Sequence, residues 1–95
     1  MQINRSARYK KSLFKILDYI AQDKISASEK FLYELDKLID SLPYFPFKYR
    51  KSVYFDDENI RDMTYKGYTI VYRVNLKKDR IDILNIFNKN KPPMH

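Results

Sequence analysis

The side chains of this sequence that are best suited to chemistry are cations beside aromatic residues. Lys48, Tyr49, Arg50 and Lys51 follow one another, and Arg73 stands in the middle of an apolar run. Cations in this setting bind phosphate groups or an acidic strip of protein. Alternate residues of a strand point to opposite faces, and the face predicted to carry Arg73 holds little else that is charged. We therefore expect Arg73 to take part in function.

Most other chemistries lack the residues that they need. The chain has no cysteine, and its only histidine is His95, the last residue, so neither a metal-ligand cluster nor a histidine-dependent nucleophile is expected. The single glycine, Gly67, is too little for a glycine-rich phosphate loop. The acidic run 56–58 is predicted to be a solvated turn, because consecutive side chains diverge. We expect no metal and no other cofactor.

The net charge of the chain points to an anionic partner. Its 95 residues carry a formal charge of +7, and the basic excess lies in residues 5–15, 48–51 and 61–91. Such unevenness is typical of proteins that bind nucleic acid or an acidic protein. The length suits one domain, residues 1–95, with 88–95 as a flexible tail. No apolar run approaches the roughly 18 residues of a membrane span. We expect a cytoplasmic protein with no membrane partner.

The first half of the chain is predicted to form a short strand and two helices. Residues 1–4 are expected at a sheet edge, and apolar residues between positions 9 and 20 recur at helical spacing. Ser26 and Glu29 have the spacing of a capping box that would open the second helix, which Pro43 would end. Two helices so close in sequence form an antiparallel hairpin. The aromatic stretch 42–47 is expected to wrap over the core.

The second half has the period of strands. Strands are predicted at 52–55, 60–65, 68–75 and 81–87, with turns at 56–59, 66–67 and 76–80. The whole pattern predicts an α+β fold: a short N-terminal strand, an antiparallel helical hairpin, and an antiparallel meander of three to four strands. The helices would cover one face of the sheet and leave the other open.

This order of elements, with the motif Gly67-Tyr68-Thr69-Ile70-Val71-Tyr72-Arg73-Val74, resembles the RelE/ParE superfamily of bacterial toxins. Segments 60–63 and 83–87 match as well, so the resemblance extends over nearly the whole chain. It implies a growth-inhibiting toxin of a type II toxin–antitoxin system, neutralised by a cognate antitoxin. One branch of the superfamily cleaves messenger RNA on the ribosome. The ParE branch, associated with plasmid stabilisation, inhibits DNA gyrase.

The resemblance to the RelE-type ribonucleases lacks most of their active site. Their basic residues would fall near Ile60, Asp62 and Thr69, and their arginine after the last strand corresponds to Lys89. Positions 87–88 hold no histidine, which other branches use there. Cleavage of RNA needs a base, an acid and cations around the phosphate. These departures favour the ParE-like branch, in which the toxin is not an enzyme.

The candidate site residues follow from this interpretation. Contact with the target is predicted for Lys48, Tyr49, Arg50, Lys51, Arg73, Lys89 and Lys91. In the alternative, an mRNA endoribonuclease, the catalytic residues would be Arg73, Lys89, Arg61 and Tyr68. A second alternative is an inactive family member that only binds its antitoxin. Leu32 and Tyr33 flank the apolar stripe of the second helix, and they are candidates both for antitoxin contact and for outer core positions.

Overall fold

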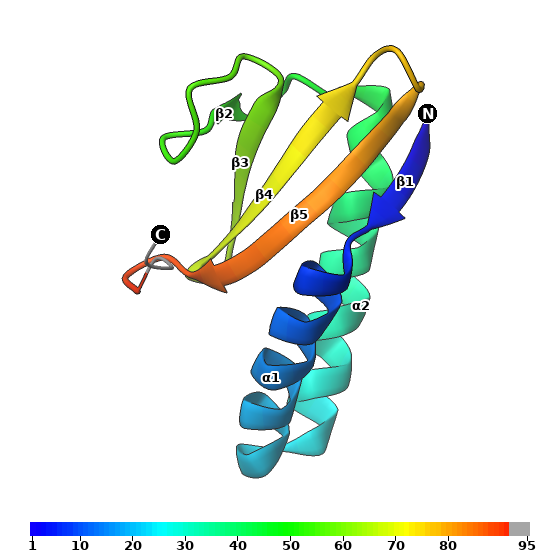
Figure 1. Ribbon diagram of the computed structural model, residues 1–95. Coiled ribbons are helices and arrows are strands. Elements are labelled where there is room, and N and C mark those ends of the chain that lie inside the picture. The colour runs from blue at the N-terminus through cyan, green and yellow to red at the C-terminus, as the bar shows by residue number, and fades with distance from the viewer. Residues whose placement is uncertain (92–95) are drawn as a thin grey trace.

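The computed structural model of the chain describes residues 1–91, and its elements follow the predicted order (Figure 1). The helices are α1 (Ala7–Asp23) and α2 (Ile25–Ser41), and a 3-10 turn, η1 (Leu42–Tyr44), follows them. The strands are β1 (Gln2–Arg5), β2 (Arg50–Lys51), β3 (Ile60–Tyr65), β4 (Tyr68–Asn75) and β5 (Arg80–Asn88). The predicted α+β fold is confirmed, while His95 lies outside the described residues.

The five strands form one mostly antiparallel sheet. Their order is β1-β5-β4-β3-β2, and β1 is the one strand that runs parallel to its neighbour. The predicted edge strand is therefore confirmed. Lys66 and Gly67, both at positive φ (47° and 83°), make the two-residue turn between β3 and β4. Two positive φ angles in succession match the right-handed twist of a hairpin, and glycine adopts them without steric cost.

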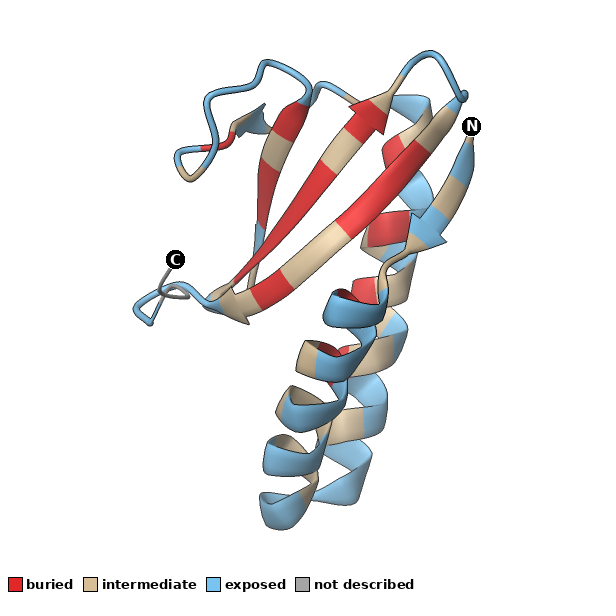
Figure 2. Cartoon of the chain, in the orientation of Figure 1, coloured by how far each residue is buried: buried red, intermediate tan, exposed pale blue. Residues whose placement is uncertain are grey.

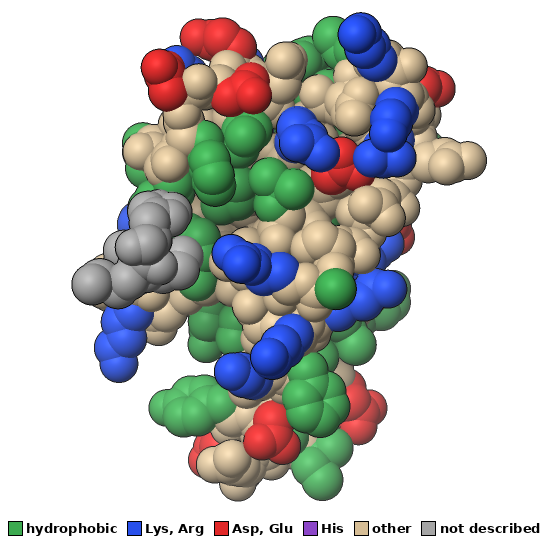
Figure 3. All heavy atoms as spheres, viewed as in Figure 1, with side chains coloured by type: hydrophobic (Ala, Val, Ile, Leu, Met, Phe, Trp, Pro, Cys, Tyr) green, Lys and Arg blue, Asp and Glu red, His purple; other side chains and the backbone are tan. Residues whose placement is uncertain are grey.

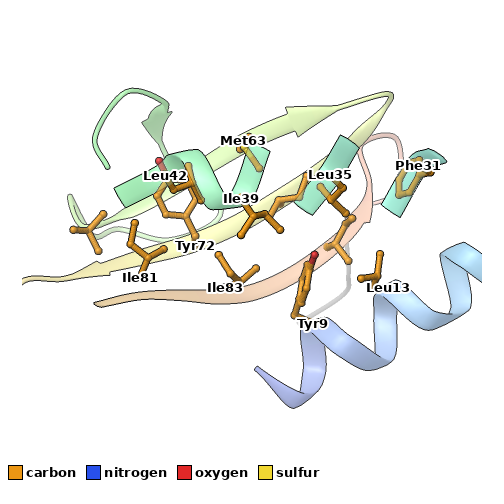
Figure 4. Close-up of a cluster of buried hydrophobic side chains, with 13 residues drawn as sticks. Tyr9, Leu13, Phe31, Leu35, Ile39, Leu42, Met63, Tyr72, Ile81 and Ile83 are labelled. Carbon is orange, nitrogen blue, oxygen red and sulfur yellow. The ribbon is translucent and has the colours of Figure 1, made fainter. Parts of the chain in front are cut away.

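The core lies between the helical hairpin and one face of the sheet. Figure 4 shows Leu35 and Ile39 of α2 beside Met63, Tyr72 and Ile83 of the sheet, and all five are 0% exposed. Each large apolar side chain buried in this way contributes about 1.5–3 kcal/mol. The turn end of the hairpin projects beyond the sheet and is exposed (Figure 2). Only the part of the hairpin near the sheet is thus held by the core.

The predicted capping box at the start of the second helix is wrong. Helix α2 begins at Ile25, directly after Lys24, and no side chain caps it. Ser28 instead donates from Oγ to the carbonyl oxygen of Leu17, 2.9 Å away on α1. Only one residue separates the two helices, so the start of α2 is set by hairpin packing rather than by the local capping signal at Ser26.

The predicted strand at 52–55 is also wrong. The strand before the acidic turn is β2, Arg50–Lys51, and the chain then leaves the ladder. The backbone N–H of Val53 donates to Oδ2 of Asp62 at 3.1 Å, and the ring of Tyr54 meets that of Phe87 edge to face at 5.1 Å. Segment 52–59 therefore folds against the sheet face that the helices leave open. Tyr54 packs on that face instead of against a neighbouring strand, while Val53 stays 64% exposed.

Candidate functional site

Arg73 lies on the sheet face turned away from the helices, but this face is not poor in charge. In the register between β4 and β5, Arg73 stands opposite Asp82, and Asp62 stands opposite its near neighbour Val71 on the same face. The Nη2 atom of Arg73 lies 2.9 Å from Oδ2 of Asp82; the two side chains are 43% and 3% exposed. The expectation of a weakly charged face was wrong, because two buried carboxylates lie on it.

Asp82 is the centre of a small polar cluster. Besides Arg73, it accepts hydrogen bonds from Nε of Arg80 at 2.7 Å and from Nδ2 of Asn4 at 3.1 Å. Burial by itself would raise the pKa of Asp82, but the hydrogen bonds from Arg73, Arg80 and Asn4 outweigh it and hold the pKa below its ordinary value. The cluster joins β1, β4 and β5, which gives Arg73 a structural task.

The acidic turn neutralises two of the predicted cations. Nζ of Lys51 lies 3.2 Å from Asp56 and 3.5 Å from Glu58. Arg61 donates from Nε to the carbonyl oxygen of Glu58 at 2.9 Å and from Nη1 to that of Tyr49 at 3.1 Å. The run 56–58 is exposed, as predicted, and it also ties segment 52–59 to the sheet edge.

The other three residues of the run 48–51 have different surroundings. Tyr49 is partly buried, with its ring 6.5 Å from that of Tyr72, so it belongs to the edge of the core. Arg50 is 57% exposed, and its Nη2 lies 3.8 Å from buried Asp62. Lys48 is exposed and forms no ion pair with any residue of the described chain. The predicted basic patch is therefore divided, and Lys48 is its most available cation.

The two tyrosines considered for proton transfer lie on the opposite face of the sheet from Arg73. Tyr68 packs edge to face against Phe31 of α2 at 5.5 Å. Tyr72 is 0% exposed, and its hydroxyl donates to the carbonyl oxygen of Pro46 at 2.7 Å. Burial raises the pKa of Tyr72 well above its ordinary value. Neither tyrosine can share a phosphate with Arg73, because the sheet stands between them.

The other candidates lie after β5 and on α2. Lys89 and Lys91 are exposed and have no ion pair within residues 1–91; the N–H of Lys89 donates to the carbonyl oxygen of Gly67 at 2.8 Å. Tyr33 is 64% exposed, and Leu32 is half-buried against the core. The structure thus brings Lys89 beside the β3–β4 turn, while the two helix residues differ in how available they are to a partner.

A surface that the sequence did not predict lies just before β2. Tyr44 is 79% and Phe45 is 69% exposed, although the stretch 42–47 was expected to wrap over the core. Only Leu42 does so, at 1% exposure. The segment 44–48, here called the aromatic loop, lines an open concavity of about 590 Å³. The available signal was composition, because three aromatic residues in four are more than one short turn can bury.

Figure 3 shows the molecule from the open face of the sheet. Lys and Arg side chains are spread over this surface instead of gathered at one point.

Within residues 1–91, no three carboxylate or imidazole side chains are placed to hold a metal ion. In the same range, no helix is long and apolar enough to cross a membrane.

A helical hairpin packed on a mostly antiparallel sheet, with dispersed cations, defines the class of a small basic α+β protein. The model of one family, the ParE toxin of the type II toxin–antitoxin system parDE, matches residues 3–92. The chain belongs to this family, and its function is that of a ParE-type toxin with a cognate antitoxin as partner.

The comparison with solved structures agrees on the fold. A chain of the chromosomal ParDE toxin–antitoxin system from P. aeruginosa superposes with a TM-score of 0.73 at 16% identity, covering 93% of this chain and 95% of that one. At this identity the match concerns the architecture and not the individual site residues. No curated protein matches the sequence.

Proposed function

We propose that this toxin acts in the cytoplasm by binding DNA gyrase, and that it blocks the enzyme through protein–protein contact without cleaving nucleic acid. The observation that carries the proposal is the separation of the candidate catalytic groups. Arg73 is paired with Asp82 on one sheet face, whereas Tyr68 and Tyr72 lie on the other. A ribonuclease would need such groups around one phosphate.

The burial of the open face also supports binding over RNA cleavage. Ile60, Asp62 and Thr69, which stand where the ribonucleases carry basic residues, are 7%, 3% and 1% exposed. Segment 52–59 folds against the same face through Val53 and Tyr54. An RNA strand would have to displace this segment before it reached the strands. It would then meet the carboxylate of Asp62, which repels phosphate.

The aromatic loop is the surface that best suits contact with a protein target. Exposed aromatic side chains in a concave setting are frequent anchors of protein interfaces. Lys48 lines the same concavity, so it places a cation beside Tyr44 and Phe45. Of the residues predicted to contact the target, Lys48, Lys89 and Lys91 remain the most available. We propose these three cations and the aromatic loop as the target contacts.

A gyrase supercoiling assay tests the proposal. Purified toxin is titrated against gyrase and relaxed plasmid, and we expect a dose-dependent loss of supercoiled product. Lys48→Glu should weaken the inhibition, whereas Lys77→Glu, the same change of charge in the β4–β5 turn, should leave it at the wild-type level. Circular dichroism melting of both variants controls for folding.

The opposite outcome is equally clear. If the wild-type toxin leaves supercoiling intact at every dose, gyrase is not the target. Primer extension on messenger RNA from cells that express the toxin then distinguishes the alternatives. Cuts linked to codons would identify a ribonuclease. Intact transcripts in cells that continue to grow would identify an inactive antitoxin-binding protein.

A further inference from the structure

Helix α1 carries basic side chains that the rest of the chain does not neutralise. Arg8, Lys11 and Lys15 are exposed, and none of them forms an ion pair within residues 1–91. Arg5, just before the helix, differs from them, because its Nη2 atom lies 3.5 Å from a carboxylate oxygen of each of two aspartates of α2. We call Arg8, Lys11 and Lys15 the cation row. Its charge is free to attract a partner from outside the chain.

One side of α1 is polar along the whole row. Positions 8, 11, 12 and 15 follow the spacing i, i+3, i+4 and i+7, which places them on one face of a helix. The fourth member of this face is Ser12, so the face consists of three cations and a hydroxyl. No acidic residue occurs in α1 before Asp18. The face therefore has neither an apolar centre nor a carboxylate of its own.

The row has a fixed position against the sheet and extends past it. The Oγ atom of Ser12 donates to Oδ1 of Asn85 at 2.9 Å, which joins α1 to β5 (Figure 1). Lys15 and Lys91, which follows β5, line one open concavity of about 440 Å³, and Asn88 lines it as well. Lys91 is exposed and has no ion pair within the described residues. Four unpaired cations are thus held on one continuous surface.

The composition of this surface indicates which kind of anion it binds. The centre of an interface with a protein is apolar, whereas interfaces with nucleic acid are more polar and much more positively charged. Amide side chains such as that of Asn88 donate to phosphate oxygens, as lysine and arginine do. A second copy of this chain is a poor occupant, because its charge of +7 would repel the row. Phosphate groups therefore suit the surface best.

The length of the row favours a duplex over a single strand. Arg8 and Lys15 are seven residues apart, roughly 10 Å along the helix. One strand of duplex DNA places a phosphate about every 3.4 Å along its axis, so the row spans about three phosphates. Proteins that bind single strands stack the bases on aromatic rings, and positions 8, 11, 12 and 15 hold none. Of the exposed rings of α1, Phe14 is not in this set and Tyr19 lies beyond Asp18.

We propose that the cation row and Lys91 bind the phosphate backbone of duplex DNA without reading its sequence. Contacts to phosphate position a protein on the duplex but carry no information about the bases. The biological setting rests on the proposed function, because gyrase acts on a DNA duplex. The aromatic loop contacts the enzyme, while α1 contacts the DNA beside it. Lys91, proposed above as a target contact, then touches the DNA that the target holds.

Fluorescence anisotropy with the full toxin chain and a short labelled DNA duplex of mixed sequence tests the inference without gyrase. We expect a Kd on the order of 1–100 µM at physiological salt, the range of binding to phosphate alone. Four phosphate contacts predict that log K falls against log salt concentration with a slope of about −3.6. The unlabelled single strand of the same sequence should compete more weakly than the unlabelled duplex.

A matched pair of variants locates the contact. Lys15→Gln should weaken binding about fivefold near physiological salt and make the salt slope less steep by about 1. Lys77→Gln removes the same charge from the β4–β5 turn, where Lys77 is exposed and has no ion pair within residues 1–91, and it should change neither value. Both side chains are exposed, so we expect both variants to keep the fold, and thermal melts by circular dichroism check this.

Four results would overturn the inference: no binding of the duplex by the wild type at low salt, equal affinities of the two variants, stronger competition by the single strand than by the duplex, or a Lys15→Gln loss that occurs with poly-glutamate and not with the duplex. The last result would assign the row to an acidic protein. Because the anisotropy assay contains no gyrase, the two proposals fail separately. A toxin that binds the duplex as expected but leaves supercoiling intact keeps the DNA contact and loses gyrase as its target. A toxin that inhibits gyrase without binding the duplex does the opposite.

Discussion

Replacing Arg73 by alanine separates a structural role from a functional one. The side chain is the most prominent cation of the sheet, and the structure pairs it with buried Asp82 at 2.9 Å. If its main task is to neutralise that carboxylate, the substitution lowers the free energy of unfolding. If its task is to contact the target, the substitution lowers toxicity and leaves the stability unchanged.

The size of the expected loss follows from what remains around Asp82. Removing one partner of a fully buried ion pair costs about 3–5 kcal/mol. The Arg73 side chain is 43% exposed, so solvent screens part of the interaction, and Arg80 and Asn4 continue to donate to the carboxylate. We therefore expect a loss of about 1–2 kcal/mol, which lowers the Tm of a domain this size by roughly 5–10 °C.

The dependence of this loss on pH identifies its cause. The pKa of Asp82 is held below its ordinary value in the folded chain, so its ionised form stabilises the fold above that ordinary value, about 4. The stabilisation is lost as the pH falls through the lowered pKa of the folded state. The difference in Tm between wild type and Arg73→Ala should therefore be full at neutral pH and shrink below a pH of about 4.

Thermal melting followed by circular dichroism, beside the supercoiling assay, gives both readouts. Arg80→Ala should also lose stability, because Arg80 donates to the same carboxylate at 2.7 Å. Lys77→Ala, in the exposed turn, should not. A variant Arg73→Ala that melts within about 1 °C of the wild type but no longer inhibits its target would refute the structural reasoning.

Three further substitutions have definite expectations. Gly67→Ala should cost about 1–2 kcal/mol in a urea titration, because φ is +83° and a Cβ meets no atom within 4 Å, so backbone strain alone acts; asparagine there should cost less. Tyr72→Phe should cost about 1 kcal/mol in the same titration, since the carbonyl of Pro46 loses its donor. Tyr54→Ala should loosen segment 52–59, so that hydrogen exchange at the Val53 amide becomes about tenfold faster; an unchanged rate would show that the ring contact does not hold the segment.

The sequence predicted the layers of the fold well, because they depend on periodicity. The strands at β3 and β4 and the helical hairpin are set by apolar spacing that only one face of each element can bury. The capping box at Ser26 failed for a different reason. Its local signal competed with hairpin packing, which needs Ser28 to reach Leu17. In this chain, where the single residue Lys24 joins the two helices, packing between the helices overrides the local capping signal.

The pairing of Arg73 with Asp82 was not predicted, because the turn before β5 was taken to be one residue too long. The turn before β5 was predicted to include Arg80, so that β5 would begin at Ile81. A symmetric hairpin would then place Arg73 opposite Ile83 instead of Asp82. In the structure β5 begins at Arg80, and the register brings Asp82 to Arg73. An error of one position exchanges the two faces of a strand, and with them the interpretation of a site.

Net charge predicts that an anionic partner exists, but only the pairing of charges shows where it binds. Most acidic residues near the sheet are committed: Asp82 to Arg73 and Arg80, and the turn 56–58 to Lys51 and Arg61. The chain has 12 acidic residues for 19 basic ones, so some basic side chains are left without an acidic partner. Part of this excess lies on α1, where the row of Arg8, Lys11 and Lys15 forms no ion pair within residues 1–91. A partner that neutralises this row gains the attraction that the chain's own carboxylates do not supply, and its binding should weaken with added salt.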